Sequence, residues 1–200
     1  MRKWMMVAGL MGAVGVMGLA AMAQTTKWDI DPAHSNAQFV VRHLGISNVQ
    51  GEFTKISGMV QLDDADISKS SVTATIDVGS VDTRQPGRDS DLKSANFFDA
   101  TKYPTMTFQS SKIWKTGDGM AKMTGNLTLH GVTKEVTFDV TGPSKAIQAM
   151  GGTRRGASAT TKINRQDFGL KYLTGMMPGG DQMIGDTVTI TLDVEMVQQK

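Results

Sequence analysis

Apolar and polar residues alternate along most of the chain from residue 36 onward, and turn residues separate the alternating runs. In the first run, Ala37, Phe39 and Val41 share one face, while polar residues occupy the other. This period of two is typical of strands that bury one face. The same pattern recurs at 49–53, 58–62, 72–78, 106–108, 123–129, 132–140 and 188–196. The pattern predicts about eight or nine strands in an all-β fold.

Only one segment, roughly residues 89–98, predicts a helix, with Asp89 or Ser90 as its N-cap. We expect turns at 63–64, 117–119 and 130–131, and Gly-rich loops at 144–156 and 174–185. Consecutive strands with short turns predict an antiparallel meander, which forms either a sandwich or a closed barrel. Long strands favour the barrel, as do the inward positions of Gly51, Gly58 and Gly125, because a curling sheet needs space on its inner face.

The inward positions also bear on what fills such a barrel. An eight-stranded barrel is either filled by side chains or holds one small ligand. Ala37, Ala74 and the three glycines are thin filling for so many long strands, so we expect space for a ligand. A solid core, with glycine only at bends, is the alternative.

The first 23 residues have the pattern of a cleavable signal peptide. Arg2 and Lys3 form a basic start, an apolar Gly-rich stretch follows to about Leu19, and residues 21–23 (Ala-Met-Ala) form a small-x-small cleavage site before Gln24. We therefore expect one mature domain, residues 24–200, in the periplasm. No later stretch approaches the length of a membrane span, so no integral membrane segment is expected after cleavage.

Charge and cysteine content narrow the function classes. The chain has 21 Lys+Arg and 19 Asp+Glu, and loss of Arg2 and Lys3 leaves 19 of each. A neutral domain without a basic block does not predict nucleic-acid binding. The chain has no cysteine, which excludes disulfides, thiol chemistry and Cys-ligated metals.

Several distinctive blocks of sequence follow one another along the chain: WDIDPAHS at 28–35, FVVRH at 39–43, GEF at 51–53, RDSDLKSANFFD at 88–99, KYPTMTF at 102–108, GNLTLHGVTK at 125–134, INRQDFGL at 163–170 and IGD at 184–186. In this order they resemble the YceI-like family of secreted lipocalin-like proteins. The resemblance implies an antiparallel eight-stranded barrel whose apolar tunnel holds a polyisoprenoid chain, such as a prenyl diphosphate or a prenylated quinone precursor. It also implies a periplasmic location and no catalytic residues.

We expect the tunnel wall to consist of apolar side chains from several strands and from the segments around the predicted helix. These are Ala37, Phe39, Val41, Phe53, Val60, Ile76, Phe98, Phe108, Leu127, Leu129, Phe138 and Phe168. Arg88 and Arg165 are candidate contacts for an anionic head group. Both stand beside acids, Asp89 and Asp91 for the first and Asp167 for the second, so structural ion pairs are an equal alternative.

Catalytic and metal chemistry find little support. His34 and His43 lie an odd number of residues apart, which places them on opposite faces of an unbroken strand, and His130 sits at a turn. No Gly-x-Ser-x-Gly motif occurs. We therefore expect no metal, no cofactor and no enzyme activity.

The favoured function is non-catalytic binding of a long-chain isoprenoid or prenylated quinone-like lipid. The alternatives are a periplasmic stress or scaffold protein and, more weakly, an enzyme on lipid or quinone substrates. The sequence leaves open whether the protein forms a homodimer, which lipid it binds, and whether binding means transport, storage or sensing.

Overall fold

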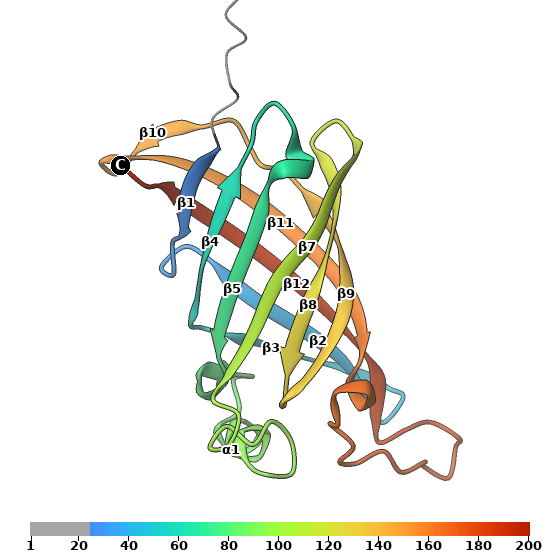
Figure 1. The fold of residues 1–200 in the computed structure, drawn as a ribbon. Coiled ribbons are helices and arrows are strands. Elements are labelled where there is room, and N and C mark those ends of the chain that lie inside the picture. Colours follow the sequence, from blue (N-terminus) through green and yellow to red (C-terminus); the bar gives the residue numbers. More distant parts are fainter. Residues whose placement is uncertain (1–24) are drawn as a thin grey trace, which may run out of the picture.

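The computed structural model describes residues 25–200, so the predicted signal peptide, residues 1–23, lies outside the described residues. Twelve strands form one antiparallel sheet (Figure 1). They are β1 (Thr26–Ile30), β2 (Asn36–His43), β3 (Ser47–Phe53), β4 (Ile56–Leu62), β5 (Ser71–Asp77), β6 (Val81–Asp82), β7 (Thr105–Gly117), β8 (Met120–Leu129), β9 (Val132–Thr141), β10 (Ile147–Ala149), β11 (Gly152–Asn164) and β12 (Ile184–Gln198).

The sheet closes on itself because β11 pairs with β9 on one edge and with β12 on the other. The ring is β12-β1-β4-β5-β7-β8-β9-β11, which makes eight positions. Strands β2, β3 and β6 continue the ring positions of β1, β4 and β5, since β2 pairs with β12 and β3, and β3 pairs with β6. The predicted eight-stranded antiparallel barrel is therefore confirmed, with three of its strands broken into two pieces each.

Four strands were missing from the sequence prediction. β1, β6 and β11 were not assigned, and the predicted loop 144–156 contains β10 and the first residues of β11. The inward positions of β11 include Ala157 and Ala159, and small side chains give little apolar contrast with the outward threonines and serines. β11 is nevertheless paired to β12 along most of its length, from Arg154 opposite Val197 to Asn164 opposite Thr187. Backbone pairing, rather than apolar patterning, defines this strand.

The helix is real but was placed too late in the sequence. α1 runs from Pro86 to Lys93, not from 89 to 98. Its N-cap is Gln85, whose side-chain oxygen accepts a hydrogen bond from the backbone N–H of Arg88. Pro86 fits the first helical turn, where its fixed φ is already suitable and no N–H is needed. Turns replace the expected last turn of helix, because the Phe98 N–H bonds to Leu92 O and the Asp99 N–H bonds to Ser94 O.

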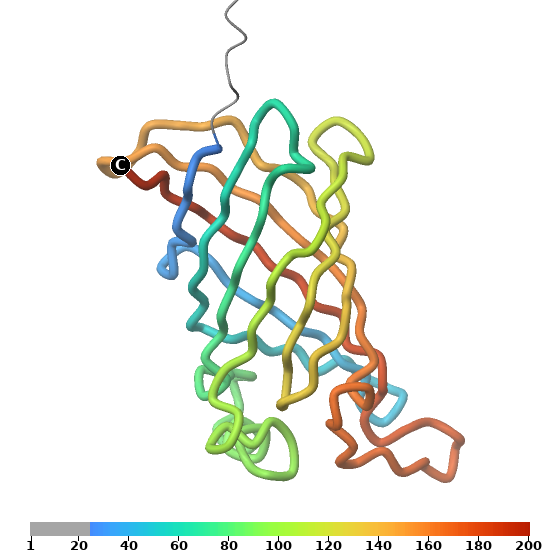
Figure 2. The backbone as a smooth tube through the Cα atoms, in the orientation of Figure 1, coloured from blue at the N-terminus to red at the C-terminus, as the bar shows by residue number. Residues whose placement is uncertain are grey.

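The two ends of the barrel carry different segments (Figure 2). At one end, here called the α1 end, α1 and its flanks lie near the loop 169–183 that follows the 3₁₀ helix η3 (Arg165–Phe168). The rings of Phe97 and Tyr172 join these two segments edge to face, with centroids 5.1 Å apart. At the opposite end, the β10 end, lie β10, the β7–β8 turn and the β4–β5 loop with its 3₁₀ helix η1 (Ile67–Lys69).

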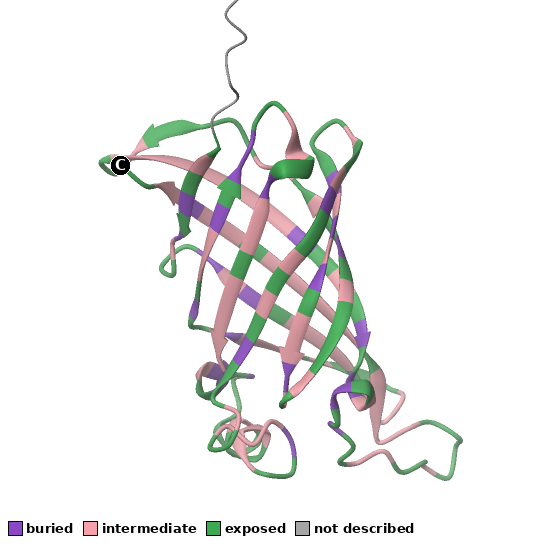
Figure 3. Ribbon diagram, in the orientation of Figure 1, coloured by how far each residue is buried: buried purple, intermediate pink, exposed green. Residues whose placement is uncertain are grey.

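Burial follows the closed sheet. Bands of exposed and less exposed residues succeed each other along the strands (Figure 3), as expected when alternate side chains face outward. The most buried apolar side chains form three clusters rather than one continuous core. Among residues 25–200, no helix has both the length and the apolar character needed to cross a membrane.

Candidate functional site

The inner faces of the strands enclose a cavity of about 690 Å³. Its lining extends from Leu92 and Phe97 at the α1 end to Ile67 and Pro143 at the β10 end, so it runs along the barrel. Midway, β12 contributes Val188, Ile190, Leu192 and Val194, which are inward yet only partly buried because they face this space. The volume lies within the range of roughly 300–1,000 Å³ that is usual for small-molecule sites.

Most of the predicted wall residues lie on this cavity. The structure places the following eleven on its lining: Ala37, Phe39, Val41, Phe53, Val60, Ile76, Phe98, Phe108, Leu127, Leu129 and Phe138. Phe168 is different: it belongs to η3, is 2 % exposed and packs in the buried cluster with Ile163 and Leu170. Phe168 is therefore core rather than wall. Contact between the eleven wall residues and a ligand stays a prediction.

Other wall residues were missed by the sequence analysis. The β12 residues carried a clear signal, because their alternation with polar residues was visible and only their role was not assigned. Ala157 and Ala159 of β11 carried almost none, since alanine marks neither face of a strand strongly. Leu170 and Leu173 lie in or near the loop 169–183, where no periodicity indicates which side chains turn inward.

The inward glycines do not provide the space in the way expected. A Cβ on Gly51 would lie 2.4 Å from the ring of Phe39, its cross-strand partner. A Cβ on Gly125 would lie 2.5 Å from the ring of Phe108 and 2.4 Å from the Gln109 carbonyl oxygen. These glycines allow large aromatic rings to lie flat against the wall. The cavity results from the width of the closed ring of strands.

Polar wall residues gather at the α1 end, where Gln85, Arg88 and Asp91 all line the cavity. Arg88 does not pair with Asp89 or Asp91. Its Nε donates to Thr83 Oγ1 at 2.7 Å and its Nη2 donates to Thr83 O at 2.8 Å. The Asp89 carboxylate instead accepts from the Thr83 N–H and hydroxyl. Arg88 is thus fixed against Thr83, which lies two residues before the N-cap Gln85. The Nη1 atom of Arg88 has no hydrogen-bond partner among the described residues.

Arg165 lines the same end but is 4 % exposed, and backbone carbonyls take up most of its donors. It donates to Leu170 O at 2.6 Å, Tyr172 O at 2.9 Å, Ile184 O at 3.0 Å and Gly185 O at 3.1 Å. Burial lowers the pKa of the guanidinium from its ordinary value, and the charge of Asp186 opposes this. Its acidic neighbour is Asp186 at 3.7 Å, not Asp167. Arg165 therefore fixes both ends of the loop 169–183.

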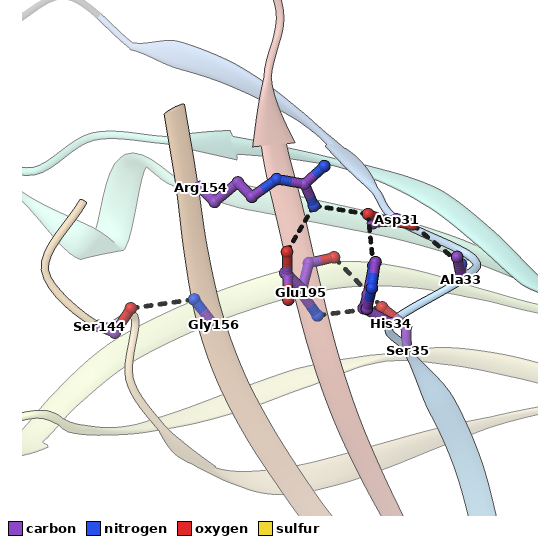
Figure 4. Close-up of polar contacts among 8 residues, drawn as sticks. All are labelled: Asp31, Ala33, His34, Ser35, Ser144, Arg154, Gly156 and Glu195. Atoms are coloured by element: carbon purple, nitrogen blue, oxygen red, sulfur yellow. Dashed lines mark hydrogen bonds and ion pairs between the residues drawn. The ribbon is translucent and has the colours of Figure 1, made fainter. Parts of the chain in front are cut away.

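One set of three potential metal ligands, Asp31, His34 and Glu195, comes together within the described range (Figure 4). Nη1 of Arg154 lies between the two carboxylates, 2.6 Å from Asp31 Oδ2 and 2.5 Å from Glu195 Oε1. His34 Nδ1 is 3.0 Å from the same Asp31 oxygen. The hydrogen bond from Arg154, followed by that from His34, holds the pKa of Asp31 well below its usual range. The guanidinium already supplies the positive charge that this cluster attracts.

The geometry defines a class of protein: a lipocalin-like antiparallel barrel that encloses an elongated apolar binding cavity. Comparison with known proteins identifies the family. The model of the YceI-like domain matches residues 28–196, so the chain belongs to the YceI-like family.

Relatives and solved structures agree with this assignment. A UPF0312 protein from Vibrio cholerae is 36 % identical over 173 residues, covering 86 % of this chain and 91 % of the relative. Another from Pseudomonas putida is 36 % identical over 180 residues, with 90 % of each chain covered. The crystal structure of Burkholderia cenocepacia BcnA matches with a TM-score of 0.71 at 29 % identity, over 83 % of this chain and 98 % of BcnA. A polyisoprenoid binding domain from Saccharophagus degradans matches in fold, with a TM-score of 0.63 at 16 % identity, over 88 % and 100 % of the two chains.

Proposed function

We propose that this protein binds one long-chain isoprenoid lipid inside its barrel, without catalysis, in the periplasm after removal of residues 1–23. The observation that carries the proposal is the cavity of about 690 Å³, whose wall is apolar along most of its length. Water gains little in such a space, because it needs two to four polar partners. Hydrocarbon gains about 0.8 kcal/mol for each buried CH₂ group.

The shape of the cavity favours a long, flexible ligand over a compact one. The wall extends from the α1 end to the β10 end, so the site is a tunnel rather than a rounded pocket. The polar wall residues of α1 and its N-cap lie at one end only, which suits a ligand with a polar head and an apolar tail. The match in fold to a domain described as polyisoprenoid binding supports the isoprenoid class by analogy.

The wall does not favour hydrolysis. Ser70 and His43 are its candidate nucleophile and base, yet Ser70 lies in the β4–β5 loop at the β10 end, while His43 ends β2 at the α1 end. Nucleophilic catalysis needs these groups within hydrogen-bond reach of each other. Ser70 Oγ is instead used structurally, as the acceptor for the buried Asp63 N–H at 3.0 Å.

The proposal is tested by mass spectrometry of organic extracts from protein exported to the periplasm and purified without detergent. We expect one isoprenoid lipid in near-stoichiometric yield, absent from extracts of an unrelated exported protein prepared in parallel. A clean, folded protein that yields no lipid, and that binds no added prenol, contradicts the proposal. Such a result favours a scaffold protein that acts through its surface.

A further inference from the structure

At the β10 end of the barrel, the indole of Trp28 lies behind part of the tunnel wall. This side chain points inward from β1, opposite Val60 of β4, and is 2 % exposed. It packs in one buried cluster with Val60, Leu62 and Met196, which are lining residues of the tunnel. Trp28 is itself absent from the lining. The ring therefore lies behind Val60, Leu62 and Met196 and fills the space into which this part of the tunnel would otherwise extend.

Arg155 of β11 covers the Trp28 ring from across β12, the strand that pairs with both β1 and β11. It lies opposite Met196 in the pairing of β11 with β12. It also shares one face of β11 with the inward Ala157 and Ala159, so its side chain points inward. Its guanidinium carbon is 5.2 Å from the centroid of the Trp28 ring, within the range of a cation–π contact. The side chain is only 14 % exposed.

Asp64 fixes the guanidinium in this position. Its two carboxylate oxygens accept from Nη1 and Nη2 of Arg155 at 2.5 and 2.9 Å, which is the bidentate geometry that orients an arginine best. Asp64 is held in turn by the fold of the β4–β5 loop. The buried Asp63 accepts from the backbone N–H groups of Ala65 at 3.0 Å and Asp66 at 2.9 Å.

An arginine that points into the end of an apolar barrel is costly unless it is paired. Its Nε is buried and has no hydrogen-bond partner among the described residues. A leucine or methionine would fill this position without that cost. The ion pair links β11 to the β4–β5 loop at the end of the barrel, with the Asp64 side chain 60 % exposed and the guanidinium against the Trp28 ring.

We propose that Trp28, Arg155 and Asp64 form a stopper that sets the longest isoprenoid chain the tunnel accepts. This inference rests on the proposed function. A chain whose head lies at the α1 end extends its tail toward the β10 end, where Val60, Leu62 and Met196 stand between the next isoprene unit and the indole. To pass, the tail must displace the ring and break the Arg155–Asp64 pair.

The test measures the affinity of the purified protein for a graded series of linear prenols. The wild-type protein is expected to show a sharp cutoff in chain length. Arg155→Ala removes the cover, and Trp28→Leu removes the ring. Each is expected to move the cutoff to longer prenols, with an affinity gain of at least about tenfold for the first excluded length, since a buried five-carbon unit is worth more than that. Shorter prenols should bind unchanged.

Arg154→Ala is the matched control. Arg154 precedes Arg155 on the same strand, also forms ion pairs, and points to the opposite face, so its loss should leave the cutoff unchanged. The stopper is overturned if the wild-type protein binds all lengths equally, if folded Arg155→Ala keeps the wild-type cutoff, or if Arg154→Ala moves it as far. Should Trp28→Leu fail to fold, Arg155→Ala decides. A wild-type protein that binds no prenol overturns the proposed function as well, which separates the two failures.

Discussion

Arg88 and Arg165 look alike in the sequence, each beside an acid and each a candidate for a head group, but their surroundings differ. Arg165 is buried and donates to four backbone carbonyls, which leaves little capacity for a ligand. Arg88 is exposed at the mouth, and its hydrogen bonds to Thr83 use Nε and Nη2 only. No local sequence feature separates the two, because the carbonyls around Arg165 come from residues 170–185. We infer that Arg165 has a structural role and that Arg88 is the residue that contacts the head group of the ligand.

Arg165→Ala is expected to destabilise the protein by about 3 kcal/mol or more, because it leaves buried carbonyls without donors. Chemical denaturation measures this loss. Arg165→Lys keeps the charge but not the planar set of donors, so it should recover only part of the stability. Unchanged stability in Arg165→Ala, together with selective loss of prenyl diphosphate binding, would reverse this assignment.

Arg88→Ala is expected to weaken binding of a prenyl diphosphate by about tenfold or more, since a charge-assisted contact contributes about 1.5–3 kcal/mol. Binding of the uncharged prenol of the same length should change little. The control is Lys93→Ala, which removes a positive charge from the same helix at a position off the tunnel wall. Equal losses for both ligands, measured side by side by calorimetry, would show that Arg88 only supports the fold.

At the scale of elements, the turn between β1 and β2 is joined to the seam formed by β11 and β12. Asp31 accepts from Arg154 of β11, and the Ser35 hydroxyl donates to the Glu195 carbonyl of β12 while accepting from the Glu195 N–H. These contacts hold the first strand of the ring against the last. This charged cluster therefore adds to the closure that the backbone pairing of β1, β12 and β11 provides.

The charge of Asp31 makes this closure pH-dependent. Its folded pKa lies below the ordinary value of 3.8, chiefly because of Arg154, so the ionised form stabilises the folded state. That contribution is fully present above pH 3.8 and is lost as the pH falls below it. Asp31→Asn should thus lower the free energy of unfolding at neutral pH, and the difference from the wild-type protein should shrink in acid. Asp29→Asn, on β1 two residues before Asp31, is the control, and a deficit that persists undiminished below pH 3 would contradict this account.

The sequence predicted strands well where apolar and polar side chains alternate strongly, and poorly where backbone pairing alone defines the strand. β12 reads clearly because apolar residues recur at every second position from Val188 to Met196. β11 reads poorly because its inward residues are small. The start of α1 was placed at Asp89, a good N-cap type, but Pro86 and the Gln85 side chain begin the helix one turn earlier.

At the scale of the molecule, the barrel combines a rigid wall with an apolar interior that is only partly filled. The sequence predicted the closed barrel and most of the wall. It could not predict the extent of the tunnel, because that depends on pairings between residues more than one hundred positions apart, such as Ala37 opposite Leu192. Not every inward position suits a variant that fills the tunnel. Ala37 is 3 % exposed in a packed cluster and Gly125 abuts Phe108, so Ala37→Trp and Gly125→Leu would overpack the wall.

Ala74 and Thr73 of β5 provide a cleaner pair of variants. Ala74 lines the tunnel and is only partly buried, whereas Thr73 is the adjacent exposed residue on the outer face. Ala74→Trp should fill the tunnel and exclude lipid, while Thr73→Trp adds the same side chain where no lipid is bound.

Native mass spectrometry of the intact protein, purified without detergent, tests the central claim most directly. We predict that the wild-type protein and Thr73→Trp each appear with the added mass of one isoprenoid lipid, and that folded Ala74→Trp appears at the mass of the bare chain. A full lipid load on folded Ala74→Trp, equal to that on Thr73→Trp, would contradict the claim that the lipid lies inside the barrel.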